Sequence, residues 1–486
     1  MRRRLAVSSL VLSGVLGAGS AGSAAALPDP SAGFSPGAPG IGDRYFPLDG
    51  NGGYDVAGYE LDLAYDPATD LLSGSAAITA TATQDLTSFD LDLSGLDVAS
   101  VTVDGVPSAF VRLGSELVVL PDTPVGVGRT FSTVVTYSGT PQPVQDALGT
   151  SGFMHTDDGA IVAGQPDGAA TWFPVNDHPR DAATYDLSVT VPDGLTVVSN
   201  GTPGPVSTAD GLSTWTWSAR DPMASYLLTL AVGEFDVTTR EVGGLTYIDA
   251  LDPDLDGLVL TDDPEAPTAG QVARASLDRQ PEIVDFLSGQ FGEYPFETVG
   301  GIVDDDPTLG FALETQTRPV YSPVFFSSAF TGDSVVVHEL AHQWFGDELR
   351  LAGWEHIWLN EGFATYAEWL WSGAQGYETP AQLLDLYAEG LAADDPFWSV
   401  TIGDPGPDAL FDAAVYYRGA MTLQALREEV GDAAFFEILR TWYAGHRGQA
   451  VTIPQFTALA EEVSGADLDE FFTEWLFTPA KPASLG

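Results

Sequence analysis

The sequence predicts an α+β protein in which a β-sandwich-like N-terminal domain precedes a mainly helical domain. Up to about residue 240, short segments alternate apolar and polar residues and are separated by turn residues, as half-buried strands do. From about residue 271 onward, apolar residues recur at the spacing of amphipathic helices. The chain has 486 residues, enough for two or three domains. We place the domains at residues 43–240 and 241–486.

The first 26 residues have the pattern of a signal peptide. Arg2–Arg4 form a basic start, Leu5–Leu16 is an apolar stretch too short to span a bilayer, and Ala24–Ala26 are small residues typical of a cleavage site. We expect cleavage near Ala26, a secreted protein and a flexible lead over residues 27–42; an uncleaved anchor is the alternative. No later run resembles a transmembrane helix, so the mature chain should have no integral membrane segment.

Charge and cysteine content exclude several kinds of function. The chain has 69 acidic and 18 basic residues, a formal net charge of −51. Nucleic acids and anionic membranes bind through clustered Lys and Arg, so neither is an expected partner. Without cysteine there is no disulfide, thiolate metal ligand or cysteine nucleophile. We expect a soluble monomer that is stabilised by salt or divalent cations, because these screen self-repulsion.

The N-terminal strands are predicted from alternation and turn residues. Tyr59–Tyr65 and Phe89–Leu93 alternate apolar with polar or small side chains, and Asp104–Gly105 is a hairpin signal. Further strands are expected at Phe131–Tyr137, Tyr185–Val191 and Tyr226–Val232.

An acidic loop follows these strands. Asp252, Asp254, Asp256 and, at the twelfth position, Asp263 superficially match a calcium loop. The twelfth position lacks the bidentate glutamate, and Pro253 interrupts the pattern. A solvated loop is the favoured interpretation, with a Ca²⁺ ion bound at residues 252–263 as the alternative.

Helical periodicity organises the C-terminal half. We predict one helix over Val272–Gln290, a helix over Asp333–Phe345 that begins at Asp333 or Ser334, and another over Asn360–Trp371. Further helices are expected at Gly419–Val430, Ala433–Tyr443, Ile453–Val463 and Leu468–Leu476.

Two of these helices carry a metal-binding pattern. His338 and His342 are four residues apart and share one helix face, while Glu339 is placed beside a metal-bound water. Glu361 follows after eighteen intervening residues, on the next helix. Two histidines and one carboxylate leave a fourth zinc position open, which is typical of catalytic sites. The alternative, a surface helix with solvated histidines, conflicts with the apolar residues around them.

Three segments resemble the aminopeptidase N family of zinc gluzincins: HELAHQWFGD at 338–347, WLNEGFATY at 358–366 and VYYRGA at 415–420. The resemblance covers nearly the whole mature chain. It implies a thermolysin-like catalytic domain after the β domain, one zinc ion per chain, and peptide substrates with a free N-terminus. Glu339 would be the general base on the zinc-bound water.

The resemblance also assigns residues that bind the substrate amino terminus. Glu314, in GFALETQ at 310–316, matches the glutamate of the G-A-M-E-N motif. Phe311, Leu313 and Thr315 depart from that motif, so the motif does not predict the shape of the pocket for the first substrate residue. Gln165, anchored by FPVNDHP at 173–179, would supply the second contact to the amine.

Tyr416 would stabilise the oxyanion, because its spacing to Arg418 matches the Y-E-K-G pattern; the adjacent Tyr417 is the alternative. Glu368 lies seven residues after Glu361 and could orient a ligand histidine. Asn360 and Asp347 also match family positions, with a capping or surface role as the alternative. His356 as a fourth ligand is the least favoured assignment, and the other histidines are expected to be structural or solvated.

Three rival functions stay open: a thermolysin-like endopeptidase, a hydrolase of another electrophile such as an epoxide, and a catalytically silent secreted binding protein. Larger relatives append further domains, for which this chain has no length, so we expect a more open cleft. The sequence does not specify the preferred N-terminal residue.

Overall fold

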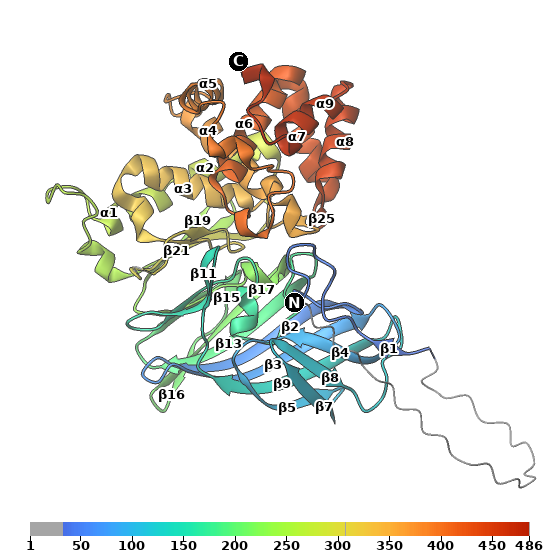
Figure 1. Ribbon diagram of the computed structural model, residues 1–486. Helices are drawn as coiled ribbons and strands as arrows, with labels where there is room; N and C mark the ends of the chain where they lie inside the picture. The colour runs from blue at the N-terminus through green and yellow to red at the C-terminus, as the bar shows by residue number, and fades with distance from the viewer. Residues whose placement is uncertain (1–32, 307, 486) are drawn as a thin grey trace, which may run out of the picture. The chain divides into compact units, whose positions relative to one another are not determined.

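In the computed structural model, which describes residues 33–306 and 308–485, strands come first along the chain and helices follow (Figure 1). This order confirms the predicted α+β class, with a mainly β N-terminal domain and a helical C-terminal domain. The predicted signal peptide, residues 1–26, lies outside the described residues. Residues 27–32 of the predicted lead also lie outside them, whereas residues 33–42 are described and include β1 (Ser35–Pro36), which pairs with a later strand.

The largest sheet of the N-terminal domain is built around the parallel pair β2 (Tyr54–Asp66) and β13 (Ala182–Pro192), in which Leu61 lies beside Leu187. Its strand order is β15-β17-β13-β2-β3-β9-β5-β6, with β16 paired to β17. The remaining bounds are β3 (Leu71–Ala82), β5 (Asp97–Val103), β6 (Val106–Pro107), β9 (Thr130–Gly139), β15 (Thr202–Pro203), β16 (Ser207–Ala209) and β17 (Leu212–Ala224).

Two smaller sheets complete this domain, in the orders β1-β4-β8-β7 and β10-β11-β12-β18-β14. Their bounds are β4 (Leu86–Asp92), β7 (Ala109–Leu113), β8 (Glu116–Leu120), β10 (Val144–Asp146), β11 (Gly149–His155), β12 (Ala160–Ala163), β14 (Thr196–Ser199) and β18 (Leu230–Gly233).

Alternation placed most of these strands correctly. Tyr59, Leu61 and Tyr65 are buried in β2, while the intervening acidic residues are exposed. Asp104 and Gly105 both have positive φ angles, 51° and 74°, in the tight turn where Val103 pairs with Val106. The predicted strand at Tyr226–Val232 was partly wrong, because Ser225–Leu227 form a 3-10 turn before β18.

A mixed five-stranded sheet supports the C-terminal domain, in the order β19-β20-β21-β23-β22. Its strands are β19 (Asp236–Val242), β20 (Leu245–Leu251), β21 (Thr298–Val303), β22 (Ala312–Leu313) and β23 (Val320–Tyr321). The predicted domain boundary at 240/241 falls inside β19. The edge strand β22 ends directly before Glu314, so the predicted amine-binding residue lies at the rim of this sheet.

The helices of the C-terminal domain gather on the side of this sheet away from the β domain (Figure 1). Their bounds are α1 (Ala269–Leu277), α2 (Gln280–Phe291), α3 (Ala329–His342), α4 (Trp358–Ala374), α5 (Pro380–Gly390), α6 (Ala413–Val430), α7 (Asp432–His446), α8 (Ile453–Ser464) and α9 (Asp469–Phe472). A short parallel strand pair, β24 (Arg350–Leu351) with β25 (Ala450–Val451), joins the segment after α3 to the segment after α7.

Helix starts were the least accurate predictions. The single helix expected over 272–290 is two helices, with the break at Asp278–Arg279 and Pro281 in the first turn of α2. Helix α3 begins four residues before the predicted start, because the Ser328 side chain accepts from the backbone N–H of Thr331. Helix α6 likewise begins at Ala413, capped by Asp412, so Tyr416 lies within it rather than before it.

Helices α4 and α6 cross in direct backbone contact. A Cβ added at Gly419 would lie 2.7 Å from the Cα of Gly362, and one at Gly362 would lie 3.0 Å from the Cα of Gly419. Only glycine permits this separation. The close crossing holds Glu361, which precedes Gly362, near Tyr416, one turn before Gly419.

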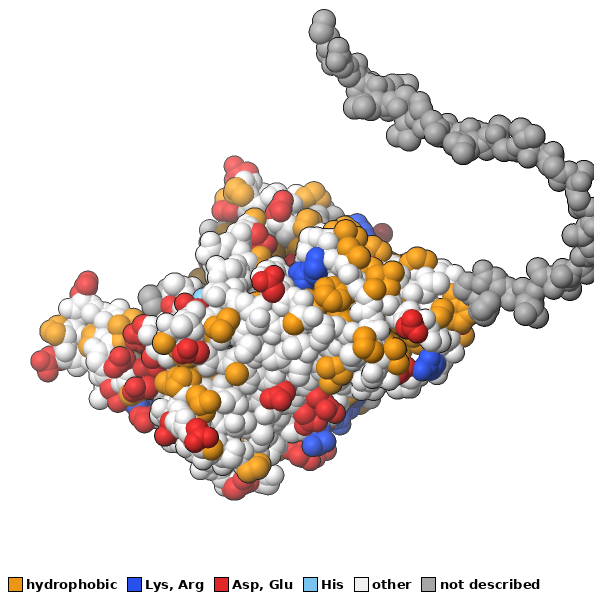
Figure 2. Space-filling model, turned by 90° about the horizontal axis from the view of Figure 1, so that it is seen from below, with side chains coloured by type: hydrophobic (Ala, Val, Ile, Leu, Met, Phe, Trp, Pro, Cys, Tyr) orange, Lys and Arg blue, Asp and Glu red, His pale blue; other side chains and the backbone are white. Residues whose placement is uncertain are grey.

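Figure 2 shows one face of the molecule, on which acidic side chains are spread widely and basic ones are few. This distribution agrees with the formal charge of −51. Among the helices that the structure describes, none is long and apolar enough to cross a membrane.

Candidate active site

Three predicted metal ligands converge between α3 and α4. The Nε2 atoms of His338 and His342 each lie 3.4 Å from Oε2 of Glu361. Tetrahedral zinc with bonds of 2.0–2.1 Å requires ligand atoms about 3.3–3.4 Å apart. The donor set and its spacing therefore fit one zinc ion.

Both histidine rings are held through their other nitrogen. Nδ1 of His338 lies 2.7 Å from Oε1 of Glu368, and Nδ1 of His342 donates to the backbone oxygen of Phe345 at 3.0 Å. Ser334 donates in turn to the second oxygen of Glu368. These bonds place the proton of each neutral imidazole on Nδ1, which leaves Nε2 free to bind a metal.

The electrostatics of the buried site favour a cation at the point where the ligands converge. Burial opposes ionisation of Glu361, but the charge of His342 and hydrogen bonds from both histidines lower its pKa to about 2. Burial likewise disfavours charged His342, yet Glu361 and Glu314 raise its pKa to about 9. Both shifts arise with imidazoles that carry a second proton, on Nε2, beside Glu361. A metal cation bound by Nε2 would take the place of that proton and leave the imidazoles neutral.

Glu339 is buried next to the ligands without belonging to the His338–His342–Glu361 triad. Burial raises its pKa to about 8, although the charges of His338 and His342 act in the opposite direction. A carboxylate in this environment binds a proton readily and returns it near neutral pH, as a general base requires.

Glu314 is fixed by donors from two domains. Its Oε1 accepts hydrogen bonds from Nε2 of Gln165 at 3.1 Å and from the hydroxyl of Tyr226 at 3.0 Å. Its backbone oxygen accepts from Nε2 of Gln343 at 3.1 Å. Ligand atoms of Glu314, Glu339 and His342 all lie within 4.8 Å of one another. The structure thus brings the two predicted amine-binding residues to the edge of the metal site.

Of the two adjacent tyrosines, only Tyr416 faces this site. Its ring stacks on His338 with centroids 5.9 Å apart, and burial followed by the charge of Glu361 raises the pKa of its hydroxyl. Tyr417 is exposed and stacks on Tyr387 instead, at 5.0 Å. A protonated phenol beside the ligands can donate a hydrogen bond to a developing oxyanion.

The remaining predicted residues are less directly connected. Asn360 and Asp347 are buried, but within the described part of the chain no side-chain hydrogen bond joins either one to His338, His342 or Glu361. His356 belongs to none of the potential metal-binding groups found in that part of the chain.

Sequence reasoning missed three residues that shape the site: Tyr226, Gln343 and Ser334. Tyr226 was assigned to a strand, and its partner lies 88 positions away. Gln343 also accepts from the backbone N–H of Thr317 at 2.7 Å, so it ties α3 to the segment that carries Glu314. Of the three, only Gln343 could have been suspected from the local sequence, because it directly follows the HELAH motif.

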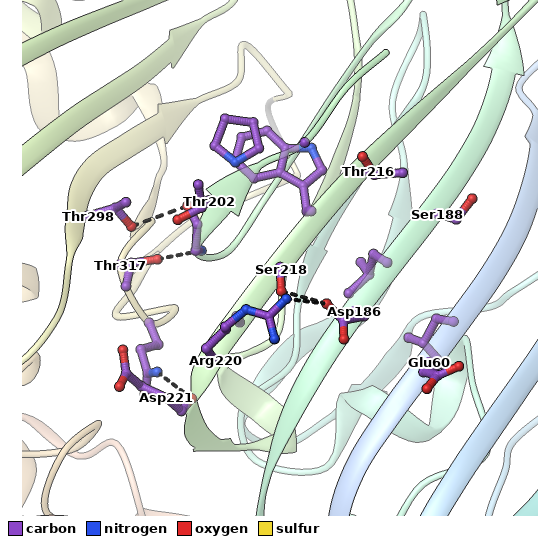
Figure 3. A pocket seen from close by; sticks show the side chains of 18 of the residues that line it. Glu60, Asp186, Ser188, Thr202, Thr216, Ser218, Arg220, Asp221, Thr298 and Thr317 are labelled. Carbon is purple, nitrogen blue, oxygen red and sulfur yellow. Dashed lines mark hydrogen bonds and ion pairs between the residues drawn. The ribbon is translucent and has the colours of Figure 1, made fainter. Parts of the chain in front are cut away.

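A separate concavity of about 1000 Å³ lies on the face of the largest β sheet. Figure 3 shows Ser218 and Arg220 pointing toward Asp186 there. From the C-terminal domain, the Thr298 hydroxyl donates to the backbone oxygen of Gly201, and the Thr317 hydroxyl accepts from the Gly201 N–H. None of the zinc-site or amine-binding residues lines it. This concavity is therefore separate from the predicted metal site.

Comparison with known proteins agrees with this arrangement. Residues 56–227 match the Peptidase M1 N-terminal domain, and residues 327–475 match the Peptidase family M1 domain. The crystal structure of an M1 zinc metallopeptidase from Deinococcus radiodurans is 31% identical, with a TM-score of 0.79 over 91% of this chain and 98% of that chain. The chain belongs to peptidase family M1. The family and fold predicted from its motifs are thereby confirmed.

Several curated M1 relatives extend beyond the region that this chain matches. It is 27% identical over 451 residues to Aminopeptidase M1-D from Oryza sativa subsp. japonica, covering 86% of this chain and 49% of the relative. It is 27% identical to Aminopeptidase N from Streptomyces lividans, covering 36% of that protein. The chain thus spans about half the length, or less, of these curated relatives. A second Deinococcus radiodurans structure, 30% identical with a TM-score of 0.79, is described as bound to a Tyr-Ser-Ala substrate.

Proposed function

We propose that this M1 family member is a zinc-dependent aminopeptidase that hydrolyses the first peptide bond of peptides with a free N-terminus. The observation that carries the proposal is the position of Glu314. Its carboxylate lies within 4.8 Å of Glu339 and His342 and is oriented by Gln165 and Tyr226. Metal ligands, a general base and an amine acceptor therefore share one small site.

The distance between these groups accounts for cleavage at the first bond. The α-nitrogen of a peptide is separated from its first carbonyl carbon by only the α-carbon. An ammonium held by the Glu314 carboxylate therefore places the first carbonyl, rather than a later one, beside Glu339. A blocked N-terminus carries no positive charge and loses this charge-assisted hydrogen bond.

His338, His342 and Glu361 would hold one zinc ion, which supplies Lewis acidity toward the carbonyl and the attacking water when bound. Glu339 takes the proton of the water and returns it to the leaving amine. The Tyr416 hydroxyl donates to the oxyanion that forms on the former carbonyl. Glu368 and the Phe345 carbonyl hold the two imidazole rings in place during these steps.

The known relatives support this assignment. The plant and Streptomyces proteins are named aminopeptidases, and one structural neighbour is described with a tripeptide substrate. We extend the proposal to a monomer exported to the extracellular side and processed near Ala26. Amino-terminal sequencing of protein recovered from the culture medium tests that site, and a mature chain that still contains Arg2–Arg4 contradicts it.

Paired substrates test the aminopeptidase proposal. We expect fluorogenic aminoacyl amides to be cleaved and their N-acetylated counterparts to resist cleavage. Glu314→Ala should lower kcat/KM for the free-amine substrates about 10- to 150-fold, the value of a hydrogen bond to a charged group. Glu389→Ala, a change at an exposed position on α5, is the matched control.

Equal cleavage of free and acetylated substrates would contradict the proposal and favour a thermolysin-like endopeptidase. A zinc-loaded protein inactive on every peptide would favour a silent binding protein. A panel with Ala, Leu, Arg and Glu at the N-terminus would define the specificity that Phe311 leaves open.

A further inference from the structure

A buried carboxylate, Asp43, joins the start of the β domain to the C-terminal domain. Its Oδ1 accepts hydrogen bonds from the backbone N–H groups of Tyr45 at 2.7 Å and Phe46 at 3.0 Å. Its Oδ2 accepts from the backbone N–H of Trp354 at 3.0 Å and lies 3.1 Å from Nε2 of His178. The side chains of Asp43 and His178 are both fully buried. One carboxylate therefore connects three segments that are far apart in the sequence.

The contacts of His178 make Asp43 a charged acceptor. Nδ1 of His178 accepts from the backbone N–H of Arg180 at 3.0 Å, and burial lowers the pKa of the ring, so the neutral imidazole carries its proton on Nε2 and donates it to Asp43. Burial opposes the charge of Asp43, but the hydrogen bonds from His178 and from three backbone N–H groups hold its pKa below the usual range of an aspartate. A charged acceptor holds the Trp354 backbone more strongly than a neutral one would.

Trp354 connects this carboxylate to the amine-binding residues. It is buried in the short 3-10 turn just before α4. Its ring packs edge-on against Phe46, with centroids 6.4 Å apart, and at a tilt against Tyr226, with centroids 5.4 Å apart. The Tyr226 hydroxyl in turn donates to Oε1 of Glu314 at 3.0 Å. The position of Trp354 therefore limits where the hydroxyl that orients Glu314 can lie.

Association of the two domains does not depend on Asp43 alone. The side-chain amide of Asn200 donates to the backbone oxygen of Gln316 at 2.7 Å. The guanidinium of Arg318 donates to the backbone oxygen of Gly201 at 2.8 Å. Asn200 and Arg318 are both buried. We therefore expect loss of the Asp43 contacts to alter the Trp354 turn locally rather than to separate the domains.

We propose that Asp43 is a positioning residue for recognition of the substrate amine, because it fixes Trp354, whose ring packs on Tyr226 where that residue meets Glu314. Asp43 acts through two packed aromatic rings and not by contact with the substrate. The inference rests on the proposed function, which assigns Glu314 to the amine. It extends the amine-binding site to the first residues of the β domain.

Asp43→Asn tests the inference. Each carboxylate oxygen accepts from two donors, so in either orientation the new NH₂ group faces two N–H donors, and the loop at 43–46 or the Trp354 turn loses its bonds. KM for free-amine aminoacyl amides should rise about 2- to 30-fold, the range for residues that act through packed neighbours. The value of kcat should change little, because the metal ligands and Glu339 are untouched.

Tyr45→Phe is the matched control in the same loop. The Tyr45 hydroxyl accepts from the backbone N–H of Gly406 at 2.9 Å, so this variant also removes a contact with the C-terminal domain, but one that does not involve Trp354. It should lower Tm and leave KM unchanged. The double variant Asp43→Asn/Tyr226→Phe should have the KM of Tyr226→Phe alone, because no hydroxyl remains to be positioned. A merely structural role of Asp43 would not produce this non-additivity.

The inference is overturned by an unchanged KM in Asp43→Asn, by an equal rise in Tyr45→Phe, or by effects of Asp43→Asn and Tyr226→Phe that multiply. If Asp43→Asn does not fold, Trp354→Phe takes its place: it keeps the backbone N–H and reduces the ring that packs on Tyr226, and an unchanged KM there is equally decisive.

Failure of the proposed function has a different signature, which is a wild-type protein that cleaves no free-amine substrate. The crystal structure of Asp43→Asn then decides the positioning role without activity. A displaced Tyr226 hydroxyl supports the role, and a hydroxyl that keeps its hydrogen bond to Glu314 contradicts it.

Discussion

Glu368 contacts the His338 ring on the side opposite the predicted metal position: its Oε1 lies 2.7 Å from Nδ1 of His338, while Nε2 faces Glu361. Replacing Glu368 with Gln removes the negative charge that makes the imidazole a stronger donor to the metal. We expect zinc affinity to fall about 10- to 100-fold. Competition with a chromogenic chelator measures this affinity. Glu378→Gln, an exposed change just after α4, should leave it unchanged, and equal affinity in the two variants would refute the role of Glu368.

Glu339 is predicted to move the proton in the reaction without holding the metal. Its isosteric replacement, Glu339→Gln, should keep one zinc per chain because His338, His342 and Glu361 are untouched. The value of kcat should fall about 10²- to 10⁴-fold, since a positioned general base contributes that much. Zinc analysis together with steady-state kinetics checks both parts. A variant that retains near wild-type kcat would exclude Glu339 as the base.

Tyr416 and Tyr417 form a natural matched pair of variants. Tyr416→Phe keeps the ring that stacks on His338 and removes only the hydroxyl, so kcat should fall about 10²- to 10³-fold while KM changes little. Tyr417→Phe should behave like the wild type, because that ring packs on Tyr387 at the surface. The opposite order of effects would assign the oxyanion role to Tyr417.

Stability should depend on pH through Asp177, which is buried in the β domain. Burial raises its pKa to about 7 in the folded chain, whereas an unfolded aspartate titrates near 4. Between these values the folded state holds a proton that the unfolded state releases, so stability falls as pH rises to about 7 and then levels off. From pH 5.5 to 7 this contributes a loss on the order of 2 kcal/mol.

Asp177→Asn isolates this effect. Its Oδ1 can accept from the backbone N–H of Ala170, and its amide can donate to the Ser225 hydroxyl, so both present contacts have a counterpart. Denaturant unfolding of the zinc-loaded protein at pH 5.5, 7 and 8 should give a flatter pH profile for the variant than for the wild type. Parallel profiles would show that Asp177 is already ionised at pH 5.5.

The metal ligands could be predicted from the sequence because their geometry is local. His338 and His342 are one helical turn apart, and any helix over those residues puts them on one face. The strand at Tyr59–Tyr65 was predictable for a similar reason, since alternation reveals which face of a strand is buried. Periodicity does not show which strand pairs with which, however, so the parallel pairing of β2 with β13 could not be predicted.

Helix starts and cross-domain contacts were not predictable from local patterns. The N-cap of α3 is Ser328 rather than the predicted Asp333 or Ser334. Asp333 instead accepts from Arg279, and Ser334 donates to Glu368. Glu314 and Gln165 were found only through the resemblance to a family. Tyr226 had no signal at all, since nothing in its neighbourhood shows that the fold brings it to Glu314.

Tyr226 should nevertheless tune recognition of the substrate amine. Its hydroxyl and the Gln165 amide both donate to Oε1 of Glu314, which orients the carboxylate toward the metal site. Tyr226→Phe removes one donor and keeps the ring that packs on Trp354, with centroids 5.4 Å apart. We expect KM for free-amine substrates to rise about tenfold, with a smaller change in kcat, because the loss weakens binding of the ammonium.

A second buried tyrosine shows whether this effect is specific. The Tyr294 hydroxyl donates to the backbone oxygen of Thr298 at 3.0 Å, in the same domain as Glu314. Tyr294→Phe should lower stability by a comparable amount without raising KM. A double variant, Tyr226→Phe with Gln165→Ala, should raise KM by less than the product of the single effects, because both residues act on one oxygen. If the effects multiply, or if Tyr294→Phe raises KM as much as Tyr226→Phe, Tyr226 does not act through Glu314.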